Sequence, residues 1–232
     1  MSLALPAMSD DVSVPAREAL DVLQNLNSDP TAYRRAMTEL GRLLGRLLSE
    51  QAFKQGDNVC LAMTVEDADY LGLGALEALE TAGLNVSVVC FWNEREEAFG
   101  LDWAKLAPVT QEYVEPLDGV DQIVMLKSII SGSCVVRTNL EHLFDDISPS
   151  RVHVVAPVML DGADERLTQE FPRELSERFQ YWMFEVDTER EKNGDVVPGI
   201  GGEVYGRLGL GDQAAKNKVM PDLVRQRIGA AA

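Results

Sequence analysis

The chain has 232 residues, 46% of them hydrophobic and 25% charged, which is the composition of a globular protein with a sizeable core. Lys and Arg number 21 against 38 Asp and Glu, giving a formal net charge of −17. A field this negative repels the phosphates of nucleic acids, so the charge excludes nucleic acid as a partner. No run approaches the roughly 20 apolar residues that span a bilayer, and no secretory signal pattern is present. We therefore expect a cytoplasmic protein without a membrane partner.

Metal-ligating and nucleophilic residues are few. The three cysteines, Cys60, Cys90 and Cys134, lie in apolar runs, which favours reduced and mostly buried thiols. The two histidines, His142 and His153, lie in unrelated contexts, and neither has a nucleophile beside it. We therefore expect neither a metal site nor a catalytic triad.

The N-terminal part of the chain predicts an arm followed by a long helix. Residues 1–28 are interpreted as an arm with a short helix near residues 16–25. Asp29 or Ser28 can cap the next helix, and Pro30 suits its first turn because an N–H group there has no backbone partner to lose. This helix is expected to end near Phe53 and carries an apolar stripe at helical spacing. The stripe consists of Tyr33, Met37, Leu40, Leu43, Leu44, Leu47 and Leu48.

From residue 58 onward, short apolar runs alternate with amphipathic ones. The predicted strands are residues 58–64, 86–92, 122–126, 151–159 and 181–186, and the predicted helices are residues 69–82, 135–144 and 164–171. This alternation predicts right-handed crossovers and an α/β fold with a mainly parallel central sheet flanked by helices. Ligands of such sheets bind outside the carboxyl ends of the strands, so the turns at those ends are the candidate sites.

A turn of small residues follows the strand that ends at Leu126. Ser131, Gly132, Ser133 and Cys134 lead into the next predicted helix. Backbone N–H groups and hydroxyls at a helix N-terminus can close around an anion, so this turn is a candidate phosphate site. The alternative is a simple connecting turn, because serine-glycine turns join strands to helices in many proteins.

A glycine-rich segment follows the last predicted strand. Residues 193–202 contain four glycines and Pro198, a composition that forbids a helix and lets the backbone approach a planar ligand closely. A plain surface loop is the alternative. The residues considered for a base-binding loop are Val197, Pro198, Gly199, Ile200 and Gly201.

The order of these motifs resembles one known family. Val186 and Asp187, then the Pro-Gly-Ile-Gly segment that begins at Pro198, then Arg207, are similar to the signature of the uracil phosphoribosyltransferases. Further matches follow in order through residues 29–210. They are Tyr33-Arg34, Glu39-Leu40-Gly41-Arg42-Leu43-Leu44, Leu71-Gly72-Leu73-Gly74, the run from Leu126 to Cys134, Val155-Ala156-Pro157 and Phe171-Pro172.

The resemblance implies a type I phosphoribosyltransferase-like fold and a site for a small phosphorylated ligand or nucleotide. Members of the family transfer ribose 5-phosphate from phosphoribosyl pyrophosphate to uracil. The resemblance places the 5′-phosphate at the Ser131 to Cys134 turn and the base against the main chain from Val197 to Gly201. It also implies Mg²⁺ as a cofactor if the chain is catalytic.

The sequence departs from the family where pyrophosphate and metal would bind. Leu126 and Lys127 stand where the family has the acidic residue of its phosphate loop, and Tyr70 stands where it has a pyrophosphate-loop arginine. The turn before Tyr70 holds Glu66, Asp67 and Asp69. We expect these carboxylates to repel a diphosphate. A second family arginine is matched by Arg95 or equally well by Asn93, and Arg95 is the candidate for a pyrophosphate contact.

Three functions remain open from the sequence. The favoured one is a phosphoribosyltransferase-like protein that binds a nucleotide-like or phosphorylated ligand without efficient transfer. The second is an active uracil phosphoribosyltransferase of pyrimidine salvage with atypical site residues. The third is a structural or partner-binding role without a ligand.

The predicted organisation is an N-terminal arm (residues 1–28), one phosphoribosyltransferase-like domain (29–210) and a C-terminal extension (211–232). The extension carries four basic residues, interpreted as an exposed helix end that compensates an acidic body. They are Lys216, Lys218, Arg225 and Arg227. We also expect a homo-oligomer, for which the leucine stripe of the long helix is the candidate interface.

Overall fold

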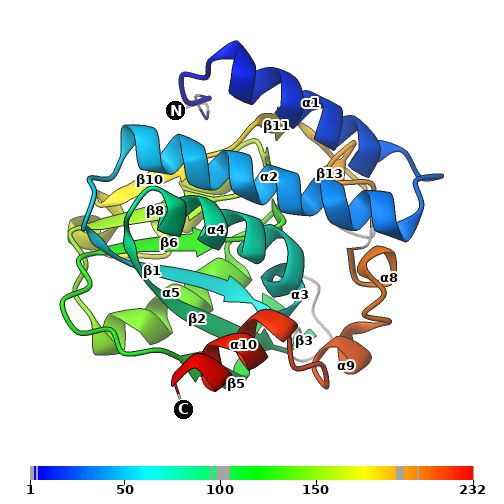
Figure 1. Ribbon diagram of the computed structural model, residues 1–232. Coiled ribbons are helices and arrows are strands. Elements are labelled where there is room, and N and C mark those ends of the chain that lie inside the picture. The colour runs from blue at the N-terminus through cyan, green and yellow to red at the C-terminus, as the bar shows by residue number, and fades with distance from the viewer. Residues whose placement is uncertain are drawn as a thin grey trace.

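A computed structural model describes residues 3, 5–94, 96–97, 105–191, 196–202 and 204–231. Its centre is a six-stranded sheet in the order β10-β8-β6-β1-β2-β5, in which β5 alone runs antiparallel (Figure 1). The strands are β1 (Asn58–Thr64), β2 (Asn85–Asn93), β5 (Val109–Val114), β6 (Gln122–Leu126), β8 (Arg151–Val155) and β10 (Phe179–Trp182). The parallel core confirms the fold class expected from the alternating pattern. The edge strand β5 was not predicted, because most of its side chains are exposed and it lacks an apolar run.

Three strands of the main sheet bend and resume as a second, smaller sheet. Its order is β11-β9-β7, which repeats the order β10-β8-β6, and all its pairs are parallel. The strands are β7 (Ile129–Ile130), β9 (Val158–Leu160) and β11 (Glu185–Asp187). The single strands predicted over residues 151–159 and 181–186 are therefore wrong. Pro157 interrupts the first because proline has no N–H to give to a ladder.

Two short antiparallel pairs complete the strands. They are β3 (Glu96–Glu97) with β4 (Lys105–Leu106), and β12 (Glu189–Arg190) with β13 (Val196–Val197). The remaining elements are α1 (Asp10–Gln24), α2 (Pro30–Gln51), α3 (Val65–Asp67), the π-helical η1 (Ala68–Gly72), α4 (Leu73–Thr81), α5 (Cys134–Asp146), α6 (Ala163–Gln169), α7 (Arg173–Ser176), α8 (Val204–Leu208), α9 (Gln213–Lys216) and α10 (Asp222–Ala231).

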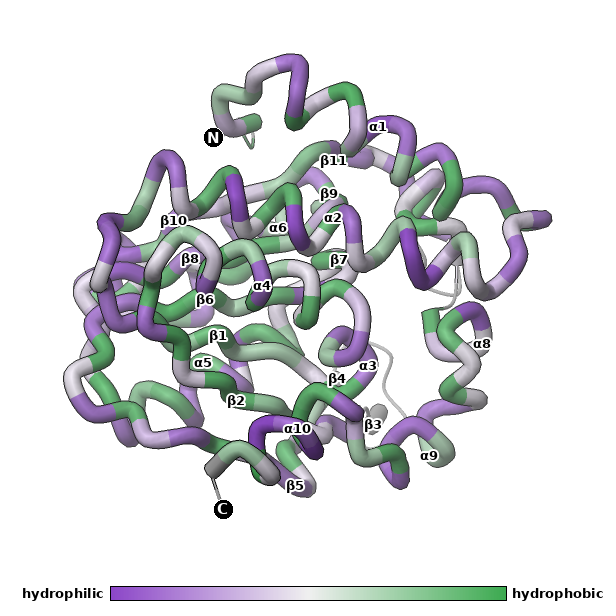
Figure 2. The backbone as a smooth tube through the Cα atoms, in the orientation of Figure 1, coloured by the Kyte–Doolittle hydropathy of each residue, from purple (hydrophilic) through white to green (hydrophobic). Residues whose placement is uncertain are grey.

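Helices cover both faces of the main sheet, and the strand side chains alternate between them. Val59, Leu61 and Met63 of β1 pack under α1, α2 and α4, whereas Cys60 and Ala62 point to α5 and α6. Because side chains on both faces of β1 are buried, apolar residues stand at each of these positions, and the sequence of the strand is one continuous hydrophobic run. In Figure 2 the strands at the centre of the molecule are coloured mainly as hydrophobic.

The N-terminal segment is part of this core. Helix α1 begins at Asp10, earlier than the short helix that the sequence predicted, and lies along α2 (Figure 1). Its buried residues are Val12, Ala16, Ala19, Leu20 and Leu23. The leucine stripe of α2 is buried against α1 and α4 of the same chain. The stripe is therefore not an exposed face on which a second copy could dock.

Glycines let α2 and α4 approach each other closely. A Cβ atom on Gly41 would lie 2.0 Å from the carbonyl oxygen of Leu71, and one on Gly74 would lie 2.0 Å from that of Thr38. Both glycines belong to motifs that resemble the transferase family. Within this chain they serve helix packing, because any side chain at either position would collide with backbone.

The thiols behave as expected. Cys60 and Cys90 are buried and Cys134 is partly exposed, and none of the three forms a disulfide. Burial raises the pKa of Cys60 to about 12. Burial, reinforced by the charges of Glu66 and Asp67, raises the pKa of Cys90 well above its ordinary value. Neither buried thiol is therefore a nucleophile at neutral pH. Within the described residues, no helix combines the length and the apolar character needed to cross a membrane.

His153 is a neutral ring inside the core. Its Nδ1 accepts the indole N–H of Trp182 at 3.1 Å, so its Nε2 carries the proton and donates to Gln122 at 3.1 Å. The ring of Phe53 packs edge-on at 4.9 Å. Burial, aided by the charge of Arg151, lowers the pKa of His153 from 6.5 to about 4.

We predict that this ring makes the fold acid-sensitive. At pH values between the ordinary pKa of 6.5 and the folded pKa of about 4, His153 is protonated in the unfolded chain and neutral in the folded chain. The free energy of unfolding should therefore fall as the pH drops through this window, by about 3 kcal/mol from this group. Urea unfolding at several pH values tests this against His153→Gln, whose curve should lack that contribution. Parallel losses in both proteins would contradict the assignment.

Candidate functional site

The carboxyl edge of the main sheet carries a buried cluster of charges. It comes from the ends of β2, β1 and β6, which are neighbours in the sheet, and from the C-terminal segment. This edge is where ligands of parallel sheets bind. The cluster consists of Thr64, Glu66, Asp67, Asn93, Lys127, Ser128 and Lys216, each at most 4% exposed.

Lys127 lies at the centre of the cluster. Its ammonium donates to Thr64 Oγ1 at 2.7 Å, to Glu66 Oε1 at 2.9 Å and to Asp67 Oδ2 at 2.6 Å. An ammonium group has three donors, so these oxygens satisfy it fully. Asp67 also accepts the Thr64 hydroxyl at 2.8 Å and the backbone N–H of Ser128 at 3.0 Å. The turn after β1 is thereby tied to the turn after β6.

Lys216 extends the cluster toward β2. Its ammonium lies 3.0 Å from Glu66 Oε2 and 3.3 Å from the carbonyl oxygen of Asn93, and 5.1 Å from the centre of the Tyr205 ring. The expectation of an exposed basic tail is therefore wrong for Lys216, which is 1% exposed. Lys216, Glu66, Lys127 and Asp67 therefore form a row of ion pairs in which positive and negative side chains alternate.

The cluster changes the expected electrostatics of this edge. Glu66 and Asp67 were expected to repel a diphosphate, but two ammonium groups neutralise them. Mg²⁺ requires carboxylate oxygens, and these already hold ammonium groups. Leu126 and Lys127 occupy the position of the family's acidic residue. The described residues of this edge therefore do not fit Mg²⁺.

The turn from Ser131 to Cys134 lies beyond the small sheet, after β7. Its residues are partly exposed, and a Cβ atom on Gly132 would meet no atom within 4 Å. Ser133 precedes α5 without capping it through its side chain. The first N–H groups of a helix have no partner in the helix itself, so the turn keeps backbone donors and open space for an anion.

Glu170 already contacts the donors of this turn. Its carboxylate accepts the Ser133 hydroxyl at 3.1 Å and the Arg137 guanidinium at 2.9 Å. Glu170 follows α6, and its side chain is 36% exposed. An anion bound at the turn would compete with this carboxylate for both donors.

The predicted base-binding loop is anchored to β11. The backbone N–H of Gly199 donates to Asp187 Oδ2 at 2.7 Å. Burial raises the pKa of Asp187, which is 5% exposed. Gly199 has φ +56°, and a Cβ atom there would lie 2.3 Å from the carbonyl oxygen of Val196. This position therefore requires glycine. Pro198 is exposed, whereas Gly199, Ile200 and Gly201 are buried.

Other elements hold the buried side of this loop. Tyr33 donates its hydroxyl to the Ile200 carbonyl at 3.0 Å. Arg207 donates to the carbonyl oxygens of Gly201 at 3.0 Å and Leu23 at 2.6 Å, and its guanidinium lies 4.2 Å from the centre of the Tyr33 ring. Arg207, which matches the family signature, thus joins the loop to α1 and α2.

The loop and the phosphate turn lie at the same end of the small sheet. Ile129 of β7 lies against the loop, because its Cδ1 is 3.2 Å from the position of a Cβ on Gly199. Two residues after Ile129 the chain enters the turn at Ser131. Arg95, the candidate pyrophosphate contact, lies outside the described residues. Within the described residues, no group of His, Cys, Asp or Glu side chains could hold a metal ion.

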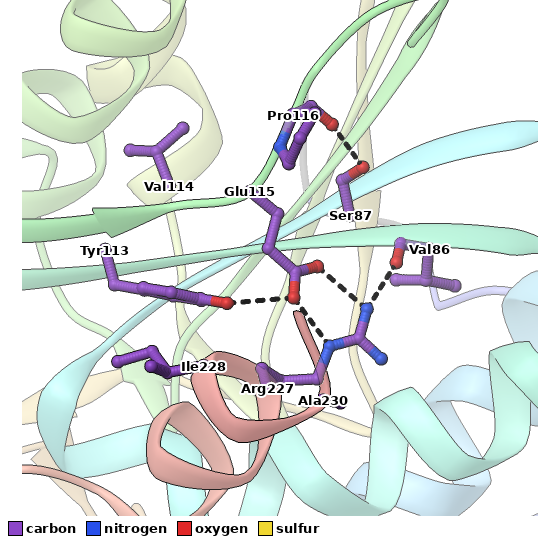
Figure 3. A pocket seen from close by; sticks show the side chains of 9 residues that line it. All are labelled: Val86, Ser87, Tyr113, Val114, Glu115, Pro116, Arg227, Ile228 and Ala230. Carbon is purple, nitrogen blue, oxygen red and sulfur yellow. Dashed lines mark hydrogen bonds and ion pairs between the residues drawn. The ribbon is translucent and has the colours of Figure 1, made fainter. Parts of the chain in front are cut away.

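An open groove of about 660 Å³ lies elsewhere, between the start of β2, the end of β5 and α10 (Figure 3). Its polar groups bind one another. Arg227 contacts Glu115 at 2.7 Å and the Val86 carbonyl at 2.9 Å, and Tyr113 donates to Glu115 at 3.0 Å. The groove therefore offers apolar walls and polar groups that are already engaged.

No protein-family model matches the chain. A uracil phosphoribosyltransferase of Natronomonas pharaonis is 23% identical over 207 residues, which cover 80% of this chain and 89% of the relative. One of Sulfolobus acidocaldarius is 20% identical over 203 residues, covering 78% and 90%. Over most of its length the chain is similar to these two uracil phosphoribosyltransferases.

A solved structure shares the architecture. The AQ2163 protein of Aquifex aeolicus matches with a TM-score of 0.67 at 15% identity, covering 88% of this chain and 97% of that one. At this identity the likeness concerns the fold alone. The α/β fold class expected from the sequence, with its mainly parallel central sheet flanked by helices, is confirmed.

Sequence reasoning missed the pairing of Lys127 and Lys216 with Glu66 and Asp67. One signal was present, since Lys127 stands between an apolar strand and a small-residue turn, where an unpaired charge would be buried. Lys216 gave no comparable signal. Its partner lies 150 residues earlier, and only the path of the C-terminal segment brings them together.

We predict that removing the Lys127 charge destabilises the fold strongly. Lys127→Met leaves two buried carboxylates with one ammonium between them, and breaking a buried pair costs about 3–5 kcal/mol. Chemical denaturation measures the loss, and exposed Lys54→Met, with a change within about 0.5 kcal/mol, is the matched control. Adding Asp67→Asn should restore part of the stability. An equally small loss in both single variants would contradict the role of Lys127.

Proposed function

We propose that this chain is a phosphoribosyltransferase-like protein that binds a small phosphorylated ligand, such as a pyrimidine nucleoside monophosphate, and does not transfer ribose phosphate efficiently. The observation that carries the proposal is the buried ammonium of Lys127 at the carboxyl end of β6, bonded to Glu66 and Asp67. The Ser131 turn, with its open space, supports the ligand half of the proposal.

The loss of transfer follows from the charges at the carboxyl edge. A leaving pyrophosphate needs positive groups that are free to contact it as its charge develops. Lys127 and Lys216 are the described cations at this edge, and both bind carboxylates of the chain itself. The family's Mg²⁺ has no suitable ligands here. Losing one stabilising group costs about 3 kcal/mol of transition-state stabilisation, or about a hundredfold in rate, and several are absent.

Binding of a monophosphate places smaller demands on the site. One phosphate needs backbone donors and hydroxyls, which the turn from Ser131 to Cys134 supplies. The loop from Val197 to Gly201 lies at the same end of the small sheet, where it can contact a base. The similarity to enzymes named uracil phosphoribosyltransferase favours a pyrimidine nucleotide among such ligands.

A transfer assay tests the catalytic half of the proposal. With radiolabelled uracil, phosphoribosyl pyrophosphate and Mg²⁺, we expect no UMP above the enzyme-free blank. The Sulfolobus acidocaldarius enzyme serves as the positive control under the same conditions. UMP formation by this chain that disappears in Gly199→Trp would overturn the proposal and indicate an active transferase.

A substitution at Gly132 tests the ligand half. Gly132→Leu places a side chain in the open space of the turn, so UMP affinity measured by calorimetry should fall by about tenfold or more, while stability stays within about 1 kcal/mol. Gly229→Leu is the matched control, because Gly229 also faces open space but lies in α10. If wild type and both variants fail to bind UMP and inorganic phosphate, this half of the proposal is wrong.

A further inference from the structure

The segment between α8 and α10 crosses the carboxyl edge as a strap. We define the strap as residues 209–221, which include α9 and Lys216. Figure 1 shows it running along the side of the sheet toward which β1 points. It joins two well-fixed elements and carries one deeply buried side chain at its centre.

Both ends of the strap are anchored. Before it, the carbonyl oxygen of Leu208 accepts two bonds from the Arg34 guanidinium, at 2.7 and 3.1 Å. After it, Leu223 and Val224 lie in the hydrophobic core. Arg227 pairs with Glu80 and also with Glu115, and Figure 3 shows the pair with Glu115. The strap can therefore open in its middle without either end leaving the fold.

The middle of the strap is mostly exposed. Apart from Lys216, the residues from Gly211 to Met220 are partly or fully exposed. The links from this stretch to the body include the ammonium of Lys216 and the carbonyl of Val219, which accepts the Trp92 indole N–H at 2.9 Å. Gly209 and Gly211 at its start have φ +80° and +77°. Segments with exposed backbone and few buried contacts open at a low free-energy cost.

The Lys216 side chain lies at the edge of the sheet where ligands of parallel sheets bind. Its ammonium bridges Glu66, after β1, and Asn93, at the end of β2, outside the carboxyl ends of two adjacent strands. A ligand extending from the Ser131 turn toward this edge would meet the strap. We propose that the strap is a latch, closed by Lys216, and that its closure and the binding of a phosphorylated ligand exclude each other. The ligand part of this inference rests on the proposed function.

The two alternatives for Lys216 predict opposite signs. As a latch, Lys216→Ala opens the strap and tightens the binding of UMP. If Lys216 instead supplied positive charge to the ligand, the same change would weaken the binding of an anion. Lys218→Ala removes the same charge two residues away from an exposed position and is the matched control.

The experiment combines hydrogen exchange with calorimetry on the full chain. In Lys216→Ala, amides of residues 211–220 should exchange about tenfold faster or more, while α10 and α2 keep their rates. The Trp92 emission should shift to the red, because the strap covers an indole that is 3% exposed. UMP should bind several-fold more tightly than to wild type, and Lys218→Ala should match wild type throughout.

Two results would overturn the latch. One is unchanged exchange over residues 211–220 in Lys216→Ala, and the other is faster exchange together with weaker UMP binding. Failure of the proposed function looks different. In that case no variant binds UMP, although the exchange and emission of Lys216→Ala still change as described.

Discussion

The structure depends on how two lysines and two carboxylates are buried together at the carboxyl edge of the sheet. Burying any one of these charges alone would cost several kcal/mol, so each requires the others. The Lys127 ammonium binds three oxygens from one turn. The second carboxylate oxygen of Glu66 binds the Lys216 ammonium. The chain thereby satisfies these buried charges with one another.

This constraint separates the two halves of the site. The half nearest β1 and β2 is occupied by side chains of the protein itself. The half beyond the small sheet, from the Ser131 turn to the loop at Pro198, has a partly exposed turn with open space at Gly132. Under the proposed function, this chain keeps a binding turn of the fold while its charges do not support the transfer reaction.

Local patterns predicted most of the fold and much less of the site. Continuous apolar runs such as β1 indicated buried parallel strands, and Asp29 with Pro30 indicated the start of α2. The bend between β8 and β9 was missed because apolar residues continue through it, and Lys216 was misread because its burial depends on a contact distant in sequence. The glycines of two family-like motifs turned out to pack helices, since sequence alone does not tell close approach to backbone from close approach to a ligand.

The most direct test of this account is a crystal structure of the chain grown with phosphoribosyl pyrophosphate and Mg²⁺. We expect the Lys127 ammonium to remain bonded to Glu66 and Asp67, with no diphosphate or metal density over the turn after β1. Electron density for a Mg²⁺-bound diphosphate at that turn, with Lys127 turned away from both carboxylates, would contradict it.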